Sequence, residues 1–421
     1  MKVWAGPFFV IIMKVAMFTD TFLPSTNGVV SSICNLVKGF NKYKIESIIF
    51  APGDKDKVDY YEGAKVYFFK AKKFIFYPDF LLADFRNIFY KIETLIEFEN
   101  PDIVIIEDLL IIGLLGTYFS KKFNKKIVGI YHTHYEDYSP HLSKGRFTKL
   151  MKFLVGKTGM RIVKYLHNSF DITISPSEEM GEYLKSKGFK NVVVIPNGID
   201  FDKLKKFKRI NIRKKYNILA NKKLLVYVGR ISFEKNINLL IDGMRFLGED
   251  YILILVGKGP ELEKLKDYSE KLGVSSNVIF TGYVPDEELG NYYESADLFV
   301  SASASETQGM TFAEAAVFGT PSVGVNRLGA SSMIKEGYNG YKFSPGNVLD
   351  YVSKVKLFFS DTKQRRIMEK NSLVFSRQFD KNEIAKSMIK IFEEIEFKVK
   401  PSSSRIKTIL KKIFGKSKFH L

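Results

Sequence analysis

The stretch DLFVSASASETQGMTFAEAAVF, residues 297–318, is predicted to form a buried strand, a short polar loop and a helix. The strand is the apolar run 297–303, and the alanine-rich helix covers 311–318. A continuous apolar run is typical of a parallel strand that is buried on both faces. The polar loop therefore lies at the carboxyl end of such a strand, where doubly wound folds bind their ligands.

The same alternation of strand and helix is repeated in both halves of the chain. In the first half, strands are predicted at 14–18, 45–50, 102–107, 126–132, 171–177 and 192–198, with a helix at 31–40. In the second half, strands are predicted at 224–229, 251–257, 278–284, 297–303 and 321–325, with further helices at 236–246 and 261–272. This spacing favours doubly wound parallel sheets. We therefore predict an α/β protein with two facing Rossmann-like domains, joined by a polar and basic linker at 211–223.

Composition agrees with a folded protein of two domains. The chain has 421 residues, of which 45% are apolar and 26% charged, and it is long enough for two separate cores. Its one cysteine, Cys34, excludes an internal disulfide and fits a reducing cytosol. The net charge is +19, and residues 398–421 contain eight basic residues and no acidic one. Such a segment suggests a polyanionic partner, either a membrane or a nucleic acid.

The first residues do not fit a targeting signal. Residues 3–12 are apolar and follow Lys2, as in a signal peptide, but no small-residue cleavage site comes after them. Residues 13–18 fit a first buried strand instead. We interpret Met13 as the start of the native chain, and whether residues 1–12 belong to it stays open. No apolar run reaches the ~18 residues of a transmembrane helix.

The loop inside 297–318 carries the strongest chemical signal. Gly309, Met310 and Thr311 would direct backbone N–H groups at a phosphate from the start of the helix. Glu306 precedes the helix and Glu314 lies in its second turn, so one carboxylate can reach a sugar hydroxyl and the other a ribose. The alternative is a helix-terminal charge and a surface glutamate without a ligand.

Two other loops follow predicted strands. GRISFEKN (229–236) places Arg230 and Lys235 where two cations suit a diphosphate leaving group, unless both are solvated surface charges. PSTNGVV (24–30) precedes a helix, and there Asn27 and Gly28 would let a phosphate approach the backbone, unless the segment is an ordinary turn.

A histidine ends one strand of the first half. In YHTHYEDY (131–138), we expect His132 to point into the cleft between the domains. There it could hydrogen-bond a sugar hydroxyl or the reacting oxygen, although a purely structural histidine is the alternative.

Together, the paired glutamates, the 229–236 loop and the Asn27-Gly28 loop resemble family 4 of the retaining glycosyltransferases, over about residues 14–395. The resemblance implies the GT-B fold, a nucleotide-sugar donor held mainly by the second domain, and transfer with retention at the anomeric carbon. It assigns Glu314 to the ribose, Glu306 to the transferred sugar, Arg230 and Lys235 to the departing diphosphate, and the loop at Tyr283 and Val284 to the base. No cofactor is then required, and a divalent metal is compatible but not implied.

A narrower resemblance concerns the acceptor. Residues 131–138, and Asp20 together with the Asn27 loop, are similar to bacterial diacylglycerol glucosyltransferases. This implies UDP-glucose as donor, a lipid such as diacylglycerol as acceptor, and Asp20 as a substrate-binding residue. A phosphoinositide, a polyprenyl-linked saccharide and a soluble glycan stay open as acceptors, and a sugar-nucleotide epimerase of the same architecture is a weaker alternative.

The resemblance also divides the chain. We expect an acceptor-binding domain at 1–205, a nucleotide-sugar domain at 206–375, a helix at 376–397 that packs back on the first domain, and a basic amphipathic tail at 398–421.

Two segments are expected to bind an anionic membrane. Residues 65–92 combine aromatic and basic residues with apolar residues at helical spacing, unless this is a core-facing helix with many aromatics. The tail has apolar residues at helical spacing among its lysines, unless it is a solvated tail. The residues predicted to touch the membrane are Phe74, Phe76, Phe80, Phe85, Lys72, Lys73, Lys411 and Lys412. We expect a peripheral protein on the cytoplasmic face of the cell membrane, and no nucleic-acid partner because no RNA- or DNA-binding module is recognisable.

Overall fold

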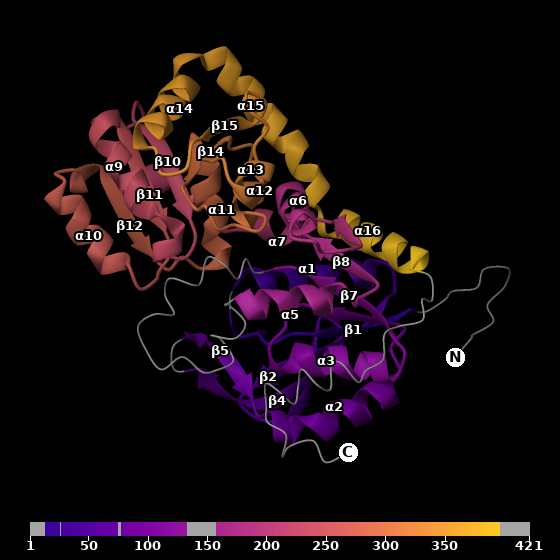
Figure 1. Cartoon of the computed structure of the whole chain (residues 1–421). Helices are drawn as coiled ribbons and strands as arrows, with labels where there is room; N and C mark the ends of the chain where they lie inside the picture. The colour runs from indigo at the N-terminus through magenta and orange to yellow at the C-terminus, as the bar shows by residue number, and fades with distance from the viewer. Residues whose placement is uncertain (1–12, 26, 75–76, 133–156, 396–421) are drawn as a thin grey trace. The chain divides into compact units, whose positions relative to one another are not determined.

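A computed structural model of the chain describes residues 13–25, 27–74, 77–132 and 157–395 (Figure 1). The chain separates into two compact units. Unit 1 comprises the chain up to Pro176, Gly181–Gly198 and the segment from Lys381, and unit 2 comprises Ser177–Met180 and Ile199–Asp380. The chain therefore enters the main part of unit 2 at 198/199 and leaves it at 380/381, and the predicted linker at 211–223 lies inside unit 2.

Unit 1 is built on a nine-stranded sheet with the order β3-β4-β2-β1-β6-β7-β8-β9, in which β5 pairs with β4. The strands are β1 (Lys14–Phe18), β2 (Glu46–Gly53), β3 (Lys57–Tyr61), β4 (Ala64–Phe74), β5 (Tyr77–Ala83), β6 (Ile103–Ile106), β7 (Lys126–Ile130), β8 (Ile172–Ser175) and β9 (Val192–Val194). Only β3 and β5 run antiparallel to their described neighbour, β4. The chain order reverses between β1 and β6, which makes this the switch point of the sheet.

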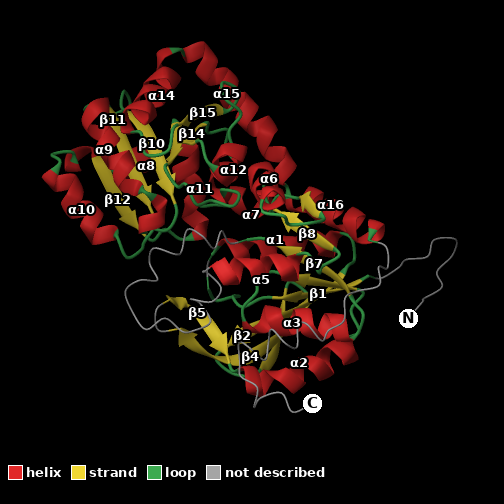
Figure 2. Cartoon of the chain, in the orientation of Figure 1, coloured by secondary structure: helices red, strands yellow, loops and turns green. Residues whose placement is uncertain are grey.

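Helices cover both faces of this sheet (Figures 1 and 2). They are α1 (Gly28–Lys42), α2 (Phe85–Glu99), α3 (Ile111–Lys122), α5 (Lys157–His167), α6 (Glu178–Ser186) and α16 (Lys381–Glu394). Val15 and Met17 of β1 join the core formed with α1 and α16. Phe18 lies on the opposite face, where its ring contacts α3 at Gly116 and stacks on Phe50 at 4.3 Å. This alternation explains why every residue of β1 after Lys14 is apolar and buried.

Unit 2 is built on a six-stranded parallel sheet with the order β12-β11-β10-β13-β14-β15. The strands are β10 (Lys223–Val228), β11 (Tyr251–Val256), β12 (Val278–Gly282), β13 (Leu298–Ser301), β14 (Ser322–Val325) and β15 (Gly340–Phe343). The helices are α7 (Phe201–Lys205), α8 (Ile212–Lys215), α9 (Ile237–Leu247), α10 (Leu262–Lys271), α11 (Asp286–Ser295), α12 (Met310–Val317), α13 (Leu328–Ser332), α14 (Val348–Ser360) and α15 (Thr362–Ser376), with short 3₁₀ turns η2 (Phe233–Lys235), η3 (Ser275–Asn277) and η4 (Arg377–Phe379). The switch point lies between β10 and β13, so the loops that follow these two strands meet there.

The predicted α/β class is confirmed, because each unit is a doubly wound, mainly parallel sheet. The prediction missed β3 and the β4–β5 pair. The helical spacing of apolar residues expected within 65–92 was wrong where it included Leu81 and Leu82, because both belong to a strand and α2 begins only at Phe85. Asp84 separates the two elements, since its side chain caps α2 by accepting the Arg86 N–H at 3.1 Å. Within the described ranges, no helix is long and apolar enough to cross a bilayer.

Candidate functional site

The start of α12 is shaped for an anion. Gly309 precedes the helix with a φ of 88°, a left-handed conformation that favours glycine. In the described part of the chain, no side chain caps this helix, which begins with Met310 and Thr311. The first N–H groups of a helix have no partner within it, and they carry its positive dipole end. The start of α12 therefore has the free backbone N–H groups that the predicted phosphate site requires.

Lys235 and Glu306 meet at the switch point of unit 2. Lys235 ends η2 after β10, Glu306 follows β13, and the ammonium lies 2.6 Å from the Glu306 Oε1. Both side chains are about one-fifth exposed, at 22% and 23%. Burial alone would raise the pKa of Glu306, but the Lys235 ammonium outweighs this and holds that pKa below its usual value. The carboxylate is thus charged and paired.

The neighbouring loops are packed backbone against backbone. A Cβ atom at Gly257 would lie 1.9 Å from the Gly229 carbonyl oxygen, and one at Gly259 would lie 2.1 Å from that of Ile231. The Ile231 N–H donates to the Lys258 carbonyl at 3.0 Å, and the Tyr227 hydroxyl donates to the Arg230 carbonyl at 3.1 Å. The glycine turn after β11 therefore holds the backbone at Ile231, and Tyr227 of β10 holds that of Arg230, which is an exposed residue.

Glu314 is partnered by a tyrosine that the sequence did not indicate. The Tyr293 hydroxyl donates to the Glu314 Oε2 at 2.6 Å. Burial raises the pKa of Glu314 to about 7, which the Tyr293 hydrogen bond only partly offsets. Tyr293 is fully buried on α11. Glu314 is therefore divided between its charged and neutral forms near neutral pH.

The predicted base-facing loop exposes one of its two residues. Tyr283 is 59% exposed, and the Lys258 ammonium lies 5.1 Å from the centre of its ring. Val284 is half-buried and packs against the core of unit 2. Only Tyr283 therefore offers a large free face in this loop.

In unit 1, two predicted binding residues hold helix starts. Asn27 caps α1 by accepting the Val30 N–H at 3.0 Å. Asp20 is fully buried, and its carboxylate accepts N–H groups from Leu110, Ile112 and Gly113 at 2.8 to 3.2 Å around the start of α3. These hydrogen bonds give both side chains a structural role that does not depend on a substrate. Gly28, by contrast, has open space where a Cβ atom would lie.

His132 follows β7 and is paired with a residue absent from the prediction, Glu107. The His132 Nε2 lies 2.7 Å from the Glu107 Oε2, and the two side chains are 4% and 0% exposed. Glu107 ends the apolar run 102–107, and an acid at the carboxyl end of a parallel strand was the available signal. The structure thus gathers the predicted residues into two groups: His132, Asp20, Asn27 and Gly28 in unit 1, and the others in unit 2.

Of the residues predicted to touch a membrane, the structure describes the side chains of only two, Phe85 and Lys72. Phe85 is only 6% exposed and its ring lies 5.6 Å from that of Phe89, so assigning it to a membrane surface was wrong: this face of α2 packs on α3, where the Phe89 ring lies 4.9 Å from that of Phe119. Lys72 is exposed. Phe76, Lys411 and Lys412 lie outside the described residues, as do the side chains of Phe74, Phe80 and Lys73.

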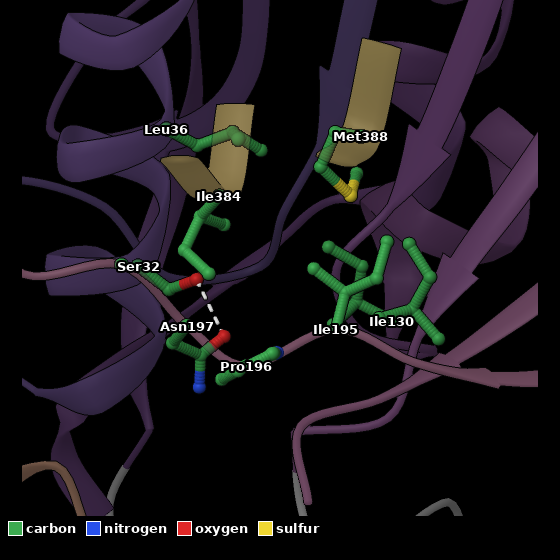
Figure 3. A pocket seen from close by; sticks show the side chains of 10 residues that line it. Ser32, Leu36, Ile130, Ile195, Pro196, Asn197, Ile384 and Met388 are labelled. Carbon is green, nitrogen blue, oxygen red and sulfur yellow. Dashed lines mark hydrogen bonds between the residues drawn. The ribbon is translucent and has the colours of Figure 1, made fainter. Parts of the chain in front are cut away.

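A small, mainly apolar pocket lies in unit 1 between α1, α16 and the ends of β7 and β8 (Figure 3). At its rim, the Ser32 hydroxyl donates to the Asn197 Oδ1 at 2.9 Å. The residues that line it include none of the predicted site residues. In the described chain, no three histidine, cysteine or acidic residues are grouped so as to hold a metal ion.

Comparison with known proteins adds independent findings. A model described as Glycosyltransferase Family 4 matches residues 26–203, and one described as Glycosyl transferases group 1 matches residues 208–374. Alpha-monoglucosyldiacylglycerol synthase of Streptococcus pneumoniae is 32% identical over 80% of this chain and 78% of its own length. A GDP-mannose-dependent alpha-mannosyltransferase of Corynebacterium glutamicum is 26% identical over 78% and 76%. Anabaena HepE, solved with UDP and glucose, has a TM-score of 0.70 at 19% identity over 90% and 99%, which shows the shared fold.

Proposed function

Since the chain belongs to the family 4 glycosyltransferases of GT-B fold, we propose that it moves glucose from UDP-glucose to a membrane lipid, diacylglycerol, with retention at the anomeric carbon. The observation that carries the donor half is the ion pair between Lys235 and Glu306 beside the start of α12. It puts a cation, helix N–H groups and a charged carboxylate at one switch point.

The chemistry of the donor fits this arrangement. Breaking the bond between the anomeric carbon and the diphosphate oxygen leaves added negative charge on the diphosphate. Lys235, Arg230 and the N–H groups of Met310 and Thr311 would neutralise that charge, and preorganised charges of this kind provide much of the catalysis in such sites. Glu306 would then bind a hydroxyl of the sugar, Glu314 the ribose and Tyr283 the base.

Several observations support the acceptor half. The relative at 32% identity is a synthase of a glucosylated diacylglycerol. The chain carries a net charge of +19, and an anionic membrane surface attracts basic segments by about 1 kcal/mol per residue. We propose a peripheral enzyme on the cytoplasmic face of the membrane that requires no metal. The relative that uses GDP-mannose makes a mannosyl donor the second candidate.

The proposal is tested by UDP release from UDP-glucose, with and without vesicles of diacylglycerol and anionic phospholipid. We expect release to depend on diacylglycerol, a glucosylated lipid to be extractable, and Glu306→Ala to lower turnover by at least about 100-fold, as for loss of one charge-stabilising group. Glu263→Ala, which removes an exposed carboxylate of the Lys266 pair in the same unit, is the matched control and should keep full turnover.

Two results would redirect the proposal. Release that is indifferent to diacylglycerol would exclude this lipid as acceptor and would point to a polyprenyl-linked or soluble acceptor. Turnover of GDP-mannose in place of UDP-glucose would replace the donor. Interconversion of UDP-sugars without any acceptor would instead indicate an epimerase.

A further inference from the structure

The pair formed by Glu107 and His132 stands at the switch point of unit 1. Glu107 follows β6, which is the neighbour of β1 across the switch point, and its N–H donates to the Phe18 carbonyl at 3.0 Å. His132 follows Tyr131, whose N–H donates to the Ile174 carbonyl at 2.9 Å. Both backbones are therefore fixed by strand pairing, and the two side chains leave rigid elements at the edge where such sheets bind ligands.

Stability alone does not explain the carboxylate of Glu107. Its side chain is 0% exposed. Oε2 meets His132 Nε2 at 2.7 Å, whereas Oε1 is buried without a hydrogen-bond partner among the described residues. A buried carboxylate with an unsatisfied oxygen destabilises the folded state, and a neutral side chain of the same shape would avoid that cost. A group retained against stability is a candidate for a function.

Resting on the transfer reaction proposed above, we propose that Glu107 is a positioning residue for His132. Its carboxylate accepts the Nε2–H, and whenever the imidazole is neutral this contact selects the tautomer whose lone pair is on Nδ1. A substrate hydroxyl held by His132, whether of the sugar or of the lipid, then donates its hydrogen bond to Nδ1. No proton is transferred in this contact, and the carboxylate makes the ring a stronger acceptor in a fixed orientation.

Mutation of Glu107 should therefore change the tautomer of the His132 ring, and only through it the rate of the reaction. In Glu107→Ala, nothing selects between the tautomers, so the acceptor nitrogen faces the hydroxyl in only a fraction of the molecules. In Glu107→Gln, the amide keeps the shape but can donate as well as accept, so it can hold the ring in either tautomer. A role limited to holding the fold would instead be preserved by this neutral isostere.

The first test needs no substrate. The full chain has five histidines and is labelled with ¹⁵N-histidine for NMR. The signals that disappear in His132→Gln are those of His132. We expect the neutral ring of the native protein to carry its proton on Nε2, and Glu107→Ala to give a mixture of tautomers. A proton on Nδ1 in the native protein, or an unchanged tautomer in Glu107→Ala, would overturn the proposal. This outcome does not depend on which substrates the enzyme uses.

The second test separates positioning from folding. We expect Glu107→Gln to lower kcat by about 10- to 100-fold, the range known for carboxylates that orient metal-bound imidazoles. KM for the donor should change less than twofold, and Tm should be unchanged or higher. Full kcat in Glu107→Gln, or a loss of kcat that follows a loss of Tm, would overturn the proposal. Absence of transfer in the native protein would instead count against the proposed function.

Glu99→Gln is the matched control, because Glu99 is another buried carboxylate of unit 1. It is fully partnered: it accepts hydrogen bonds from Lys14 at 3.2 Å and Lys65 at 2.8 Å, and a short one from Tyr67. These partners hold the pKa of Glu99 below its usual value against the opposing effect of burial. Glu99→Gln should therefore lower Tm and leave kcat per folded molecule unchanged, which is the opposite of the result expected for Glu107→Gln.

Discussion

At the scale of single residues, the raised pKa of Glu314 leads us to predict that donor binding depends on pH. Burial raises its pKa to about 7, so roughly a tenth of the molecules hold it ionised at pH 6 and nine-tenths at pH 8. If the carboxylate binds the ribose hydroxyls, the apparent affinity follows the ionised fraction. We predict that KM for the nucleotide sugar rises about tenfold from pH 8 to pH 6, measured by initial rates, and that Glu314→Gln removes this dependence. A pH dependence that survives the mutation would assign it to another group.

Protonation of Glu314 should have the opposite effect on stability: it weakens donor binding but stabilises the fold. The folded pKa, about 7, lies above the usual 4.5, so the proton bound by Glu314 stabilises the fold below pH 4.5, and this contribution is lost as the pH rises through 7. At pH 8, Glu314→Gln should therefore raise the free energy of unfolding of unit 2, by about 3 kcal/mol at most. Chemical denaturation at pH 8 and pH 5 measures this, and the gain should shrink at the lower pH.

At the scale of elements, α1 contains two glycines with opposite surroundings. A Cβ atom at Gly28, its first residue, would have nothing within 4 Å, whereas one at Gly39 would lie 2.5 Å from the Lys381 carbonyl oxygen and 2.7 Å from the Ala385 Cβ of α16. Gly39→Ala should therefore lower stability by about 1–3 kcal/mol through overpacking. Gly28→Ala should leave Tm unchanged or higher, because alanine favours helix.

Activity then decides what Gly28 is for. If a substrate approaches the backbone at the start of α1, the added methyl group of Gly28→Ala lowers kcat/KM although the fold is intact. Gly39→Ala should keep the activity of its folded fraction. Full activity in Gly28→Ala would mean that this helix start is an ordinary turn.

The elements also show where sequence patterns succeed. β6 and β11 could be predicted because both of their faces are buried, so every residue is apolar. β3 could not, because four of its five residues, KVDYY, are exposed at the edge of the sheet and follow no apolar pattern. The spacing of Leu81 and Leu82 relative to Phe85 imitates one helix, although Asp84 ends one element and caps the next.

The residues of the candidate site also divide into those that the sequence pattern could predict and those that it could not. Lys235 and Glu306 lie in segments that follow strands, and Glu314 lies in the second turn of the helix after one of them, so chain order places all three near the edge of the sheet. Glu107 and Tyr293 were missed because their partners, His132 and Glu314, lie 25 and 21 residues away. Such pairs depend on which strands and helices become neighbours, and the local pattern of the chain does not contain that information.

At the scale of the whole molecule, the chain completes unit 1 only with its last described helix. α16 buries Ile384, Met388 and Phe392 in the core of unit 1, and Phe392 lies 5.9 Å from the Phe40 ring of α1. Each such side chain contributes about 1.5–3 kcal/mol when buried. Unit 2, whose six strands lie between Lys223 and Phe343, contains none of these residues.

A chain that ends at Asp380 should therefore lose the cooperative unfolding of unit 1 and keep that of unit 2, as followed by calorimetry and by hydrogen exchange. The control is a chain that ends at Phe397, which keeps α16 but lacks the eight basic residues of 398–421. It should melt like the full chain, yet bind anionic vesicles more weakly and with less dependence on salt, because fewer charges face the lipid. Equal vesicle binding by both lengths would assign membrane attachment to the remaining body. Unchanged melting after truncation at Asp380 would show that α16 adds nothing that unit 1 needs.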